Sequence, residues 1–124
     1  MKTLIKSITG EQAEIFAMTN ERRLLARCNT CIEVLEHWQR IGTGGRVKTH
    51  RSATVHCKVI ETTGNVDVNF LRGVSCFGFA GDFQHPDGVI ERVTLYNLNP
   101  DLIDLCTGEW SFEVVGTVEK LLTF

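Results

Sequence analysis

Short alternating runs of apolar and polar residues, separated by turn residues, repeat along most of this chain. The run 109–115 alternates, so that Trp110, Phe112 and Val114 share one face of a strand. The runs 14–18 and 53–59 have a similar character, and 89–98 is rich in β-branched and aromatic residues. Turn signals lie between the runs, at 19–21, 42–45, 63–65, 85–88, 99–101 and 107–108. This punctuation predicts a mainly β protein, built as a β-sandwich or barrel.

Two stretches in the middle of the chain carry a more complex pattern. Residues 75–83 alternate, with Phe77, Phe79 and Phe83 on one side and small residues on the other. This predicts a strand whose outer face lets another backbone approach closely. Residues 66–71 fit either a strand or a helix, because their apolar positions satisfy both periods.

The segment from Arg23 to Trp38 also supports two interpretations. Its even positions form a long apolar strand face that is broken by Glu36. The same letters satisfy a helix, because an apolar stripe at i, i+3, i+4 and i+7 follows a capping box formed by Thr30 and Glu33. The pattern slightly favours a helix over Thr30–Ile41, ended by the following glycine, and leaves the strand open.

The bulk properties limit the class of protein. The 124 residues suffice for one compact domain, spanning 1–124, without a disulfide or a structural metal. Lys and Arg number 13 against 15 Asp and Glu, for a formal charge of -2, whereas a dedicated nucleic-acid binder usually carries a basic excess. No run approaches the roughly 18 apolar residues of a membrane span, and the N-terminal pattern is not that of a signal peptide. The odd cysteine count, 5, indicates reduced thiols, so we expect an intracellular protein without membrane association.

Cys28 and Cys31 form the first candidate for chemistry, as half of a zinc site or as a redox pair. A zinc site needs about four ligands, and its possible second half, His56 and Cys57, consists of adjacent residues that point to opposite faces of a strand. If 28–31 is itself a strand, its two thiols also point to opposite faces, whereas a helix or knuckle would bring them together. No parallel-sheet pattern surrounds the pair, as a redox motif requires. We therefore expect no metal and no cofactor, and we interpret the cysteines as small core side chains.

The glycine-rich stretch from Gly42 to Thr49 nearly matches a phosphate-binding loop. The motif requires glycine directly before Lys-Thr, where this chain has Val47, and a helix afterwards, where β-patterned residues follow. The turn at 85–88 indicates no catalysis either, and no activating signature surrounds any cysteine or histidine. The residues thus predict a protein that is not an enzyme.

The last third of the chain carries a resemblance to a known family. It comprises the run Glu91-Arg92-Val93-Thr94-Leu95-Tyr96, then Asn97-Leu98-Asn99, then the strand 109–115, which closes on Val118-Glu119-Lys120-Leu121. This arrangement resembles the C-terminal half of bacteriophage tail-tube proteins, in particular the contractile-tail tube proteins of PBSX-like defective prophages. A looser similarity covers the chain from about Glu14 to its end.

The resemblance implies a fold and a function. The implied fold is two packed antiparallel sheets that form a small barrel with one short helix near 66–71, and it places a strand over 23–38. Family members assemble into hexameric rings that stack into a hollow tube, and type VI secretion tubes share this architecture. We therefore expect a homo-oligomeric structural protein of a phage or prophage, the major tail-tube subunit. Its expected location is the virion tail, after assembly in the bacterial host cytoplasm.

The resemblance also implies partners and an assembly site. The expected partners are copies of the chain itself, together with tail sheath and baseplate proteins, while DNA passes through the lumen without specific binding. In the tube family a glycine-rich loop reaches towards the neighbouring ring, so we expect a flexible subunit-stacking loop here. Its residues are Gly42, Gly44, Gly45, Arg46, Lys48, His50 and Arg51.

Two other interpretations stay open. One is a small intracellular metal- or thiol-dependent enzyme that uses Cys28, Cys31 and a histidine. The other is a different β-barrel protein of the tail, acting in completion or as an adaptor. Metal content separates the first from a tube subunit, and mass in solution separates the second.

Overall fold

The computed structural model describes residues 1–19, 21–64, 66–115 and 118–124. Strands and two short helices follow one another along this range. Their bounds are β1 (Lys2–Met18), β2 (Arg22–Ile41), β3 (Gly45–Thr62), α1 (Val68–Arg72), β4 (Phe77–Gln84), β5 (Ile90–Ile103), β6 (Glu109–Val114) and α2 (Val118–Leu121). The prediction of a mainly β protein is confirmed.

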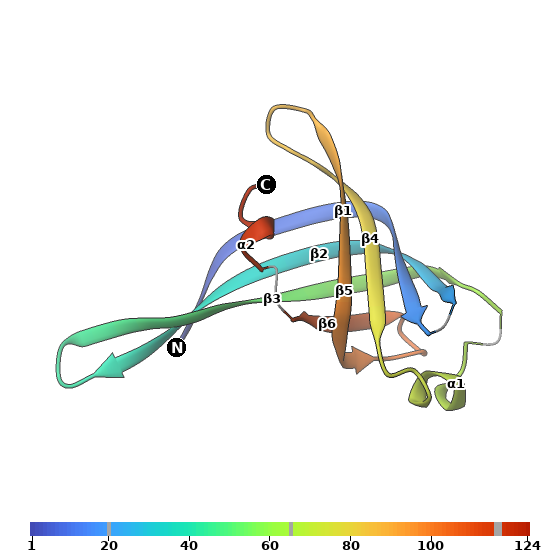
Figure 1. The fold of residues 1–124 in the computed structure, drawn as a ribbon, viewed down its shortest axis with the longest axis horizontal. Helices are drawn as coiled ribbons and strands as arrows, with labels where there is room; N and C mark the ends of the chain where they lie inside the picture. The colour runs from blue at the N-terminus through green and yellow to red at the C-terminus, as the bar shows by residue number, and fades with distance from the viewer. Residues whose placement is uncertain (20, 65, 116–117) are drawn as a thin grey trace.

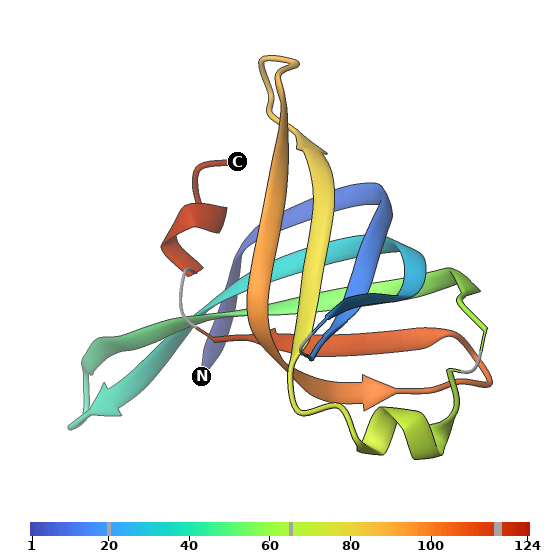
Figure 2. The same ribbon diagram turned by 45° about the vertical axis from the view of Figure 1, so that its right-hand side comes forward.

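All of these strands belong to one antiparallel sheet, which closes on itself. Each strand pairs with two neighbours in the order β1-β2-β3-β6-β5-β4, and β4 returns to β1, so the sheet forms a closed barrel. Figure 1 and Figure 2 show β4 and β5 crossing in front of the long strands β1, β2 and β3. The two separate sheets that the resemblance implies are one continuous sheet, because β5 pairs first with β4 and then with β6.

Period-two alternation fills the barrel with apolar side chains. Trp110, Phe112 and Val114 are all buried, as are Phe77 and its neighbours on the same face of β4. Phe77 packs against Phe112 with ring centroids 5.2 Å apart, and Trp110 meets Phe112 edge-on at 6.5 Å. The predicted inward faces of β4 and β6 are confirmed.

The segment 23–38 is a strand. β2 pairs with β3 from Ala26 to Ile41 and with β1 from Arg22 to His37, and its even positions between Ala26 and Val34 are buried. Pairing on both edges satisfies the backbone N–H and C=O groups, and this long-range pairing outweighs the helical stripe and the capping box. The locally favoured helix is wrong, and the strand that the resemblance placed here is confirmed.

Helices occur at two places. Asp67 caps α1, since its carboxylate accepts a hydrogen bond of 2.8 Å from the backbone N–H of Phe70. Of the two interpretations of 66–71, the helix is confirmed from Val68 onward, while Val66 and Asp67 precede it. A second helix, α2, adds to the single helix that the sequence predicts. It buries Val118 and Leu121.

The C-terminal segment lies beside the ends of β1 and β4. The Phe124 ring stacks on His85 with centroids 4.3 Å apart and meets Phe83 of β4 edge-on at 6.0 Å. Lys6 of β1 donates a hydrogen bond of 3.3 Å from Nζ to the backbone oxygen of Leu122. β1 pairs with β4 only over Glu14–Ala17, so this segment covers part of the barrel where the two strands no longer pair.

The turn predicted at 99–101 is wrong. β5 continues through Pro100, with a register shift between Pro100 and Leu102, and changes its partner from β4 to β6 at this point. Proline has no N–H to donate to the ladder, and an irregularity in register is one of the few places where a strand accepts it. The turn residues therefore mark a bend within one strand.

β2 and β3 continue past the rest of the sheet as a two-stranded hairpin, which projects to one side in Figure 1. We name residues 37–51 the arm. Pairing of β1 with β2 ends at Lys2 opposite His37, and pairing of β6 with β3 ends at Val114 opposite Ala53. Every residue from Gln39 to His50 is exposed.

Candidate functional site

The structure divides the predicted stacking loop between a turn and a strand. Gly42 and Gly44 lie in the turn at the tip of the arm, where Gly42 has a φ of 60° that favours glycine. The remaining predicted residues lie on β3: Gly45, Arg46, Lys48, His50 and Arg51. The expectation of an irregular loop is wrong, because from Gly45 onward these residues are paired with β2 in a regular hairpin.

A charged network ties the base of the arm to the C-terminal helix. Glu36 contacts Lys48 Nζ at 3.1 Å and Arg51 Nε at 3.3 Å. The Arg51 guanidinium also reaches Glu119 of α2 at 2.8 Å. The hydrogen bond from Lys48 lowers the pKa of Glu36, burial opposes it, and the hydrogen bond from Arg51 lowers it further.

The outer part of the arm is basic. Residues 37–51 contain no Asp or Glu, and Arg40 and Arg46 lie directly opposite each other on the two strands. Both are exposed, and neither forms an ion pair with a carboxylate among the residues that the structure describes. Like charges directly opposite each other destabilise an antiparallel pair. The arm is therefore suited to a partner that supplies negative charge.

Two histidines stack at the base of the arm. His37 and His50 are direct cross-strand partners, with ring centroids 4.1 Å apart and ring planes 9° from parallel. His37 Nε2 lies 2.6 Å from Ser52 Oγ. Desolvation lowers the pKa of His37 most, followed by the positive charges of His50, Lys2 and the N-terminal amine.

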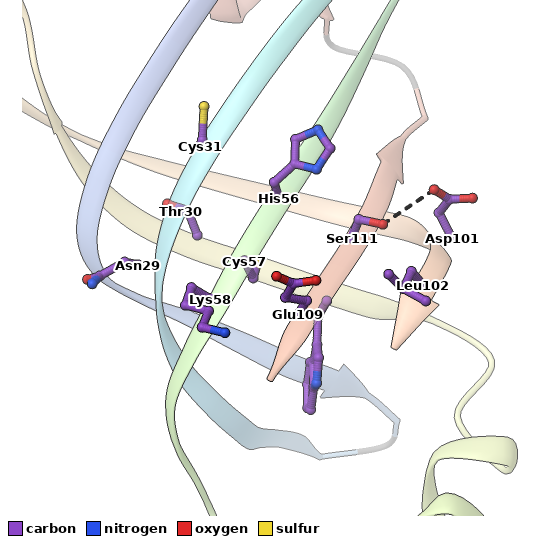
Figure 3. Close-up of a pocket in the computed structure, with 11 residues that line it drawn as sticks. Asn29, Thr30, Cys31, His56, Cys57, Lys58, Asp101, Leu102, Glu109 and Ser111 are labelled. Atoms are coloured by element: carbon purple, nitrogen blue, oxygen red, sulfur yellow. Dashed lines mark hydrogen bonds between the residues drawn. The ribbon is translucent and has the colours of Figure 1, made fainter. Parts of the chain in front are cut away.

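A separate groove of about 630 Å³ lies on the outer face of the barrel, over β2, β3, β6 and the end of β5. Figure 3 shows Cys31, His56 and Ser111 side by side on neighbouring strands of this face. Cys31 is the cross-strand partner of His56, and His56 is the partner of Ser111. The groove thus collects a thiol, an imidazole and a hydroxyl in one row.

The polar groups of this row are engaged with other partners. Ser111 Oγ donates to Asp101 Oδ2 at 3.3 Å, which is the dashed line in Figure 3, whereas a catalytic serine would donate to the histidine. His56 Nε2 instead pairs with Glu33 Oε1 at 3.2 Å. Cys31 Sγ lies 3.2 Å from Ser7 Oγ. The row has the residue types of a nucleophilic site without its hydrogen-bond order.

Acidic residues gather at the end of the barrel farthest along β3 from the arm. Glu109 lies opposite Lys58 near the end of β3, and Asp104 occupies the turn between β5 and β6. Backbone N–H groups of Thr107 and Cys106 hydrogen-bond to the Asp104 carboxylate and hold its pKa below the usual range. Asp101 lies at the same end of β5, and all three carboxylates are exposed or half-exposed.

The two cysteines of the Cys-x-x-Cys motif point apart. Cys28 is fully buried and its thiol donates to the backbone oxygen of Ala13 at 3.7 Å, while Cys31 faces the outer groove. A hydrogen bond to the Cys28 thiol, together with burial, raises the pKa of Cys57. In the described part of the chain, no group of three or more His, Cys, Asp or Glu side chains is placed to hold a metal ion.

Sequence reasoning missed the two features that depend on register. The outer groove joins residues from distant strands, and the histidine stack joins two positions that the pattern alone treats as unrelated. The near-match to a phosphate-binding loop lacks the helix that the motif needs, because β3 follows its glycines.

Among the described residues, neither helix has the length and apolar character needed to cross a membrane.

Comparisons with known proteins identify no relative. No protein-family model, no curated protein and no solved structure matches this chain.

Proposed function

We propose that this protein is a self-assembling structural subunit of a phage or prophage tail tube. In this proposal hexameric rings of the chain stack into a hollow tube, with sheath and baseplate proteins as further partners. The tube passes DNA or other cargo without binding it specifically, and its subunit needs no cofactor and performs no catalysis. The subunit is made in the bacterial host cytoplasm and works in the virion tail.

The observation that carries the proposal is a pair of edges on one sheet at which no strand pairs among the described residues. The described C-terminal segment hydrogen-bonds to these edges only through the side chains of Lys6 and Arg51. β4 pairs with β1 only over Glu14–Ala17, so within the described residues no strand pairs with the outer edge of Lys2–Gly10. β6 pairs with β3 only over Ala53–Lys58, which leaves the edge of Gly45–Ser52 without a strand among the described residues. Such edges present backbone donors and acceptors that another strand readily pairs with.

The position of these edges favours a ring over a simple dimer. One edge belongs to β1 and the other to β3, on opposite sides of the shared strand β2. A contact in which the β1 edge of one copy meets the β3 edge of the next is heterologous. Such contacts close into rings when the rotation per copy allows it and otherwise continue as filaments.

The charges of the arm support contact between successive rings. The arm is basic and free of acids, whereas Asp101, Asp104 and Glu109 lie at the other end of the barrel. Complementary charge on opposite ends of one subunit favours head-to-tail stacking and disfavours like ends meeting. The net charge of -2 leaves no basic excess to grip DNA in the lumen.

The resemblance of the last third supports the same proposal. The run Glu91–Tyr96 lies on β5, the strand 109–114 is β6, and Val118–Leu121 forms α2. The run Glu91–Tyr96 pairs with β4, and β5 pairs with β6 only from Asn99 to Ile103. The matching residues of β5 and β6 therefore lie on strands that are neighbours in the sheet, and α2 contacts β3 through Glu119 and Arg51.

Negative-stain microscopy of concentrated protein, together with mass by light scattering over a range of concentrations, tests the proposal. We expect rings or tubes and a mass that rises with concentration in discrete steps. Protein that stays monomeric at every concentration would favour the adaptor interpretation instead. Stoichiometric zinc in protein purified without added metal would favour the metal enzyme.

A matched pair of variants tests the role of the arm. Replacing Arg40, Arg46 and Lys48 with Ser should block stacking and leave a folded subunit or single rings. The control variant has Ser in place of Arg27, Arg72 and Lys120, which are exposed basic residues outside the arm. It changes the net charge by the same amount. If both variants lose assembly alike, the arm has no special role and only net charge matters.

A further inference from the structure

The histidine stack occupies the point where the arm leaves the barrel. His37 is the last residue of β2 that β1 flanks, and the register between β2 and β3 shifts directly after it, between His37 and Trp38. Directly beyond this bulge the Trp38 N–H donates to Met1 O at 2.9 Å, and the N-terminal amine donates to Trp38 O at 3.3 Å. From Gln39 outward the described hairpin consists of two strands alone. A two-stranded hairpin is marginal in water, so the order of the arm depends on the contacts at its base.

The surroundings of the two rings are mostly cationic. Lys2 at the start of β1 and the N-terminal amine of Met1, which precedes β1, both raise the local positive potential at His37. From β3 comes His50 itself, stacked face to face at 4.1 Å. From β6, Glu113 lines the same hollow, but it forms no ion pair with either histidine within the described residues.

Protonation of both rings therefore works against the stack. When both rings are uncharged, they pack as any parallel aromatic pair does. In acid they become two like charges directly opposite each other on paired strands, which destabilises the pair. The Ser52 hydroxyl does not offset this, because it accepts from a protonated His37 as readily as it donates to a neutral one.

We propose that His37 and His50 form an acid-sensitive clasp, which holds the arm in its ordered hairpin at neutral pH and releases it when both rings are protonated. The folded pKa of His37 is below the unfolded value of about 6.5, so the folded arm binds protons less readily than the released arm. The stabilisation by the clasp is fully present above pH about 6.5, the unfolded pKa. It is lost as the pH falls from there through the lower folded pKa of His37. Any contact that the arm makes is then weakened by acid.

Nuclear magnetic resonance of the full chain tests the clasp at a concentration where the chain is monomeric, with a chelator present to exclude bridging metal. At pH 7.5 we expect backbone order parameters of about 0.85 for residues 38–50. At pH 5.0 we expect values below about 0.6 for these residues, while the order parameters of the barrel strands stay the same. Replacing His37 and His50 together with Gln should keep the arm ordered at both pH values. The control variant His56→Gln, on the outer groove, should retain the acid response.

The clasp is overturned if the wild-type arm is equally ordered at both pH values, or if the response persists in the double variant. A second measurement needs no variant: the ring-proton titration of wild-type His37 should give a pKa below 6.5, and a value at or above 6.5 overturns the clasp. Both readouts use the isolated subunit, so the clasp does not rest on the proposed tube. Failure to form tubes leaves the clasp intact, and failure of the clasp leaves tube assembly intact.

Discussion

The ring of Phe83 lies over Gly10 so closely that a Cβ atom on Gly10 would sit 2.6 Å from Cε1 of the ring. Gly10 is on β1 near the point where it separates from β4, and Phe83 is buried on β4 against Phe124. The absence of a side chain at Gly10 therefore lets the aromatic row of β4 fill the barrel where the two strands no longer pair.

Gly10→Ala should destabilise the fold by about 1–3 kcal/mol, because the added methyl group forces a packed aromatic ring to move. Urea unfolding of the variant and the wild type measures this difference in the free energy of unfolding. Gly44→Ala is the control, since a Cβ atom at that position of the arm has no neighbour within 4 Å. Equal stability of the two variants would contradict the close approach of β1 and Phe83.

Removing one arginine of the pair at the tip of the arm should not destabilise the subunit. In Arg46→Ser the repulsion with Arg40 disappears, so we expect unfolding free energy unchanged or raised by about 0.2–1 kcal/mol. The exposed pair of Arg27 and Glu61, at 2.9 Å, gives the comparison, because Arg27→Ser removes an attraction instead. Loss of stability in Arg46→Ser greater than that in Arg27→Ser would show that Arg46 has a stabilising contact within the subunit.

The cysteines should separate into two classes of reactivity. Cys31 and Cys76 are half-exposed and Cys106 is exposed, whereas Cys28 and Cys57 are buried. The thiolate is the reactive form, and the raised pKa of Cys57 keeps it protonated at pH 8. A disulfide reagent should therefore modify Cys31, Cys76 and Cys106 quickly in native protein and the other two only in denaturant. Fast labelling of Cys28 or Cys57 would mean that this part of the barrel opens readily.

Local patterns predicted the strands whose two faces differ most. β6 was predictable because polar and apolar residues alternate along it, and β4 because Phe77, Phe79 and Phe83 share one face. The segment of β2 was not, because Thr30, Glu33 and the apolar stripe also satisfy a helix, and the deciding term is pairing with residues far away in the chain. The turn predicted around Pro100 was wrong for the same reason, because a strand can bend at a proline where its pairing partner changes.

The candidate site was less predictable than the fold. The glycines of the arm signalled a turn correctly, but the length of the hairpin depends on how far β2 and β3 pair beyond the barrel. The opposition of Arg40 with Arg46, and of His37 with His50, follows only from that register. A shift of one residue would have separated each pair onto opposite faces.

The strand that carries the resemblance also makes the sharpest prediction about stability. Phe112 is fully buried in the barrel between Phe77 and Trp110, while Glu113 next to it is exposed on the outer face. Phe112→Ala should cost about 3–5 kcal/mol, through lost burial and the cavity that remains. That is a large share of the roughly 5–15 kcal/mol that stabilises a small domain. Glu113→Ala should change the unfolding free energy by no more than about 0.5 kcal/mol.

Thermal melts of these two variants measure the difference directly. We expect the melting temperature of Phe112→Ala to fall by about 10 °C or more and that of Glu113→Ala to stay within a few degrees of the wild type. If assembly is measured on the same samples, Glu113→Ala is informative in its own right, because its surface is available for contacts between subunits. Small and equal shifts for both variants would mean that β6 does not present Phe112 to the core, and the resemblance to tail-tube proteins would lose the strand on which it depends.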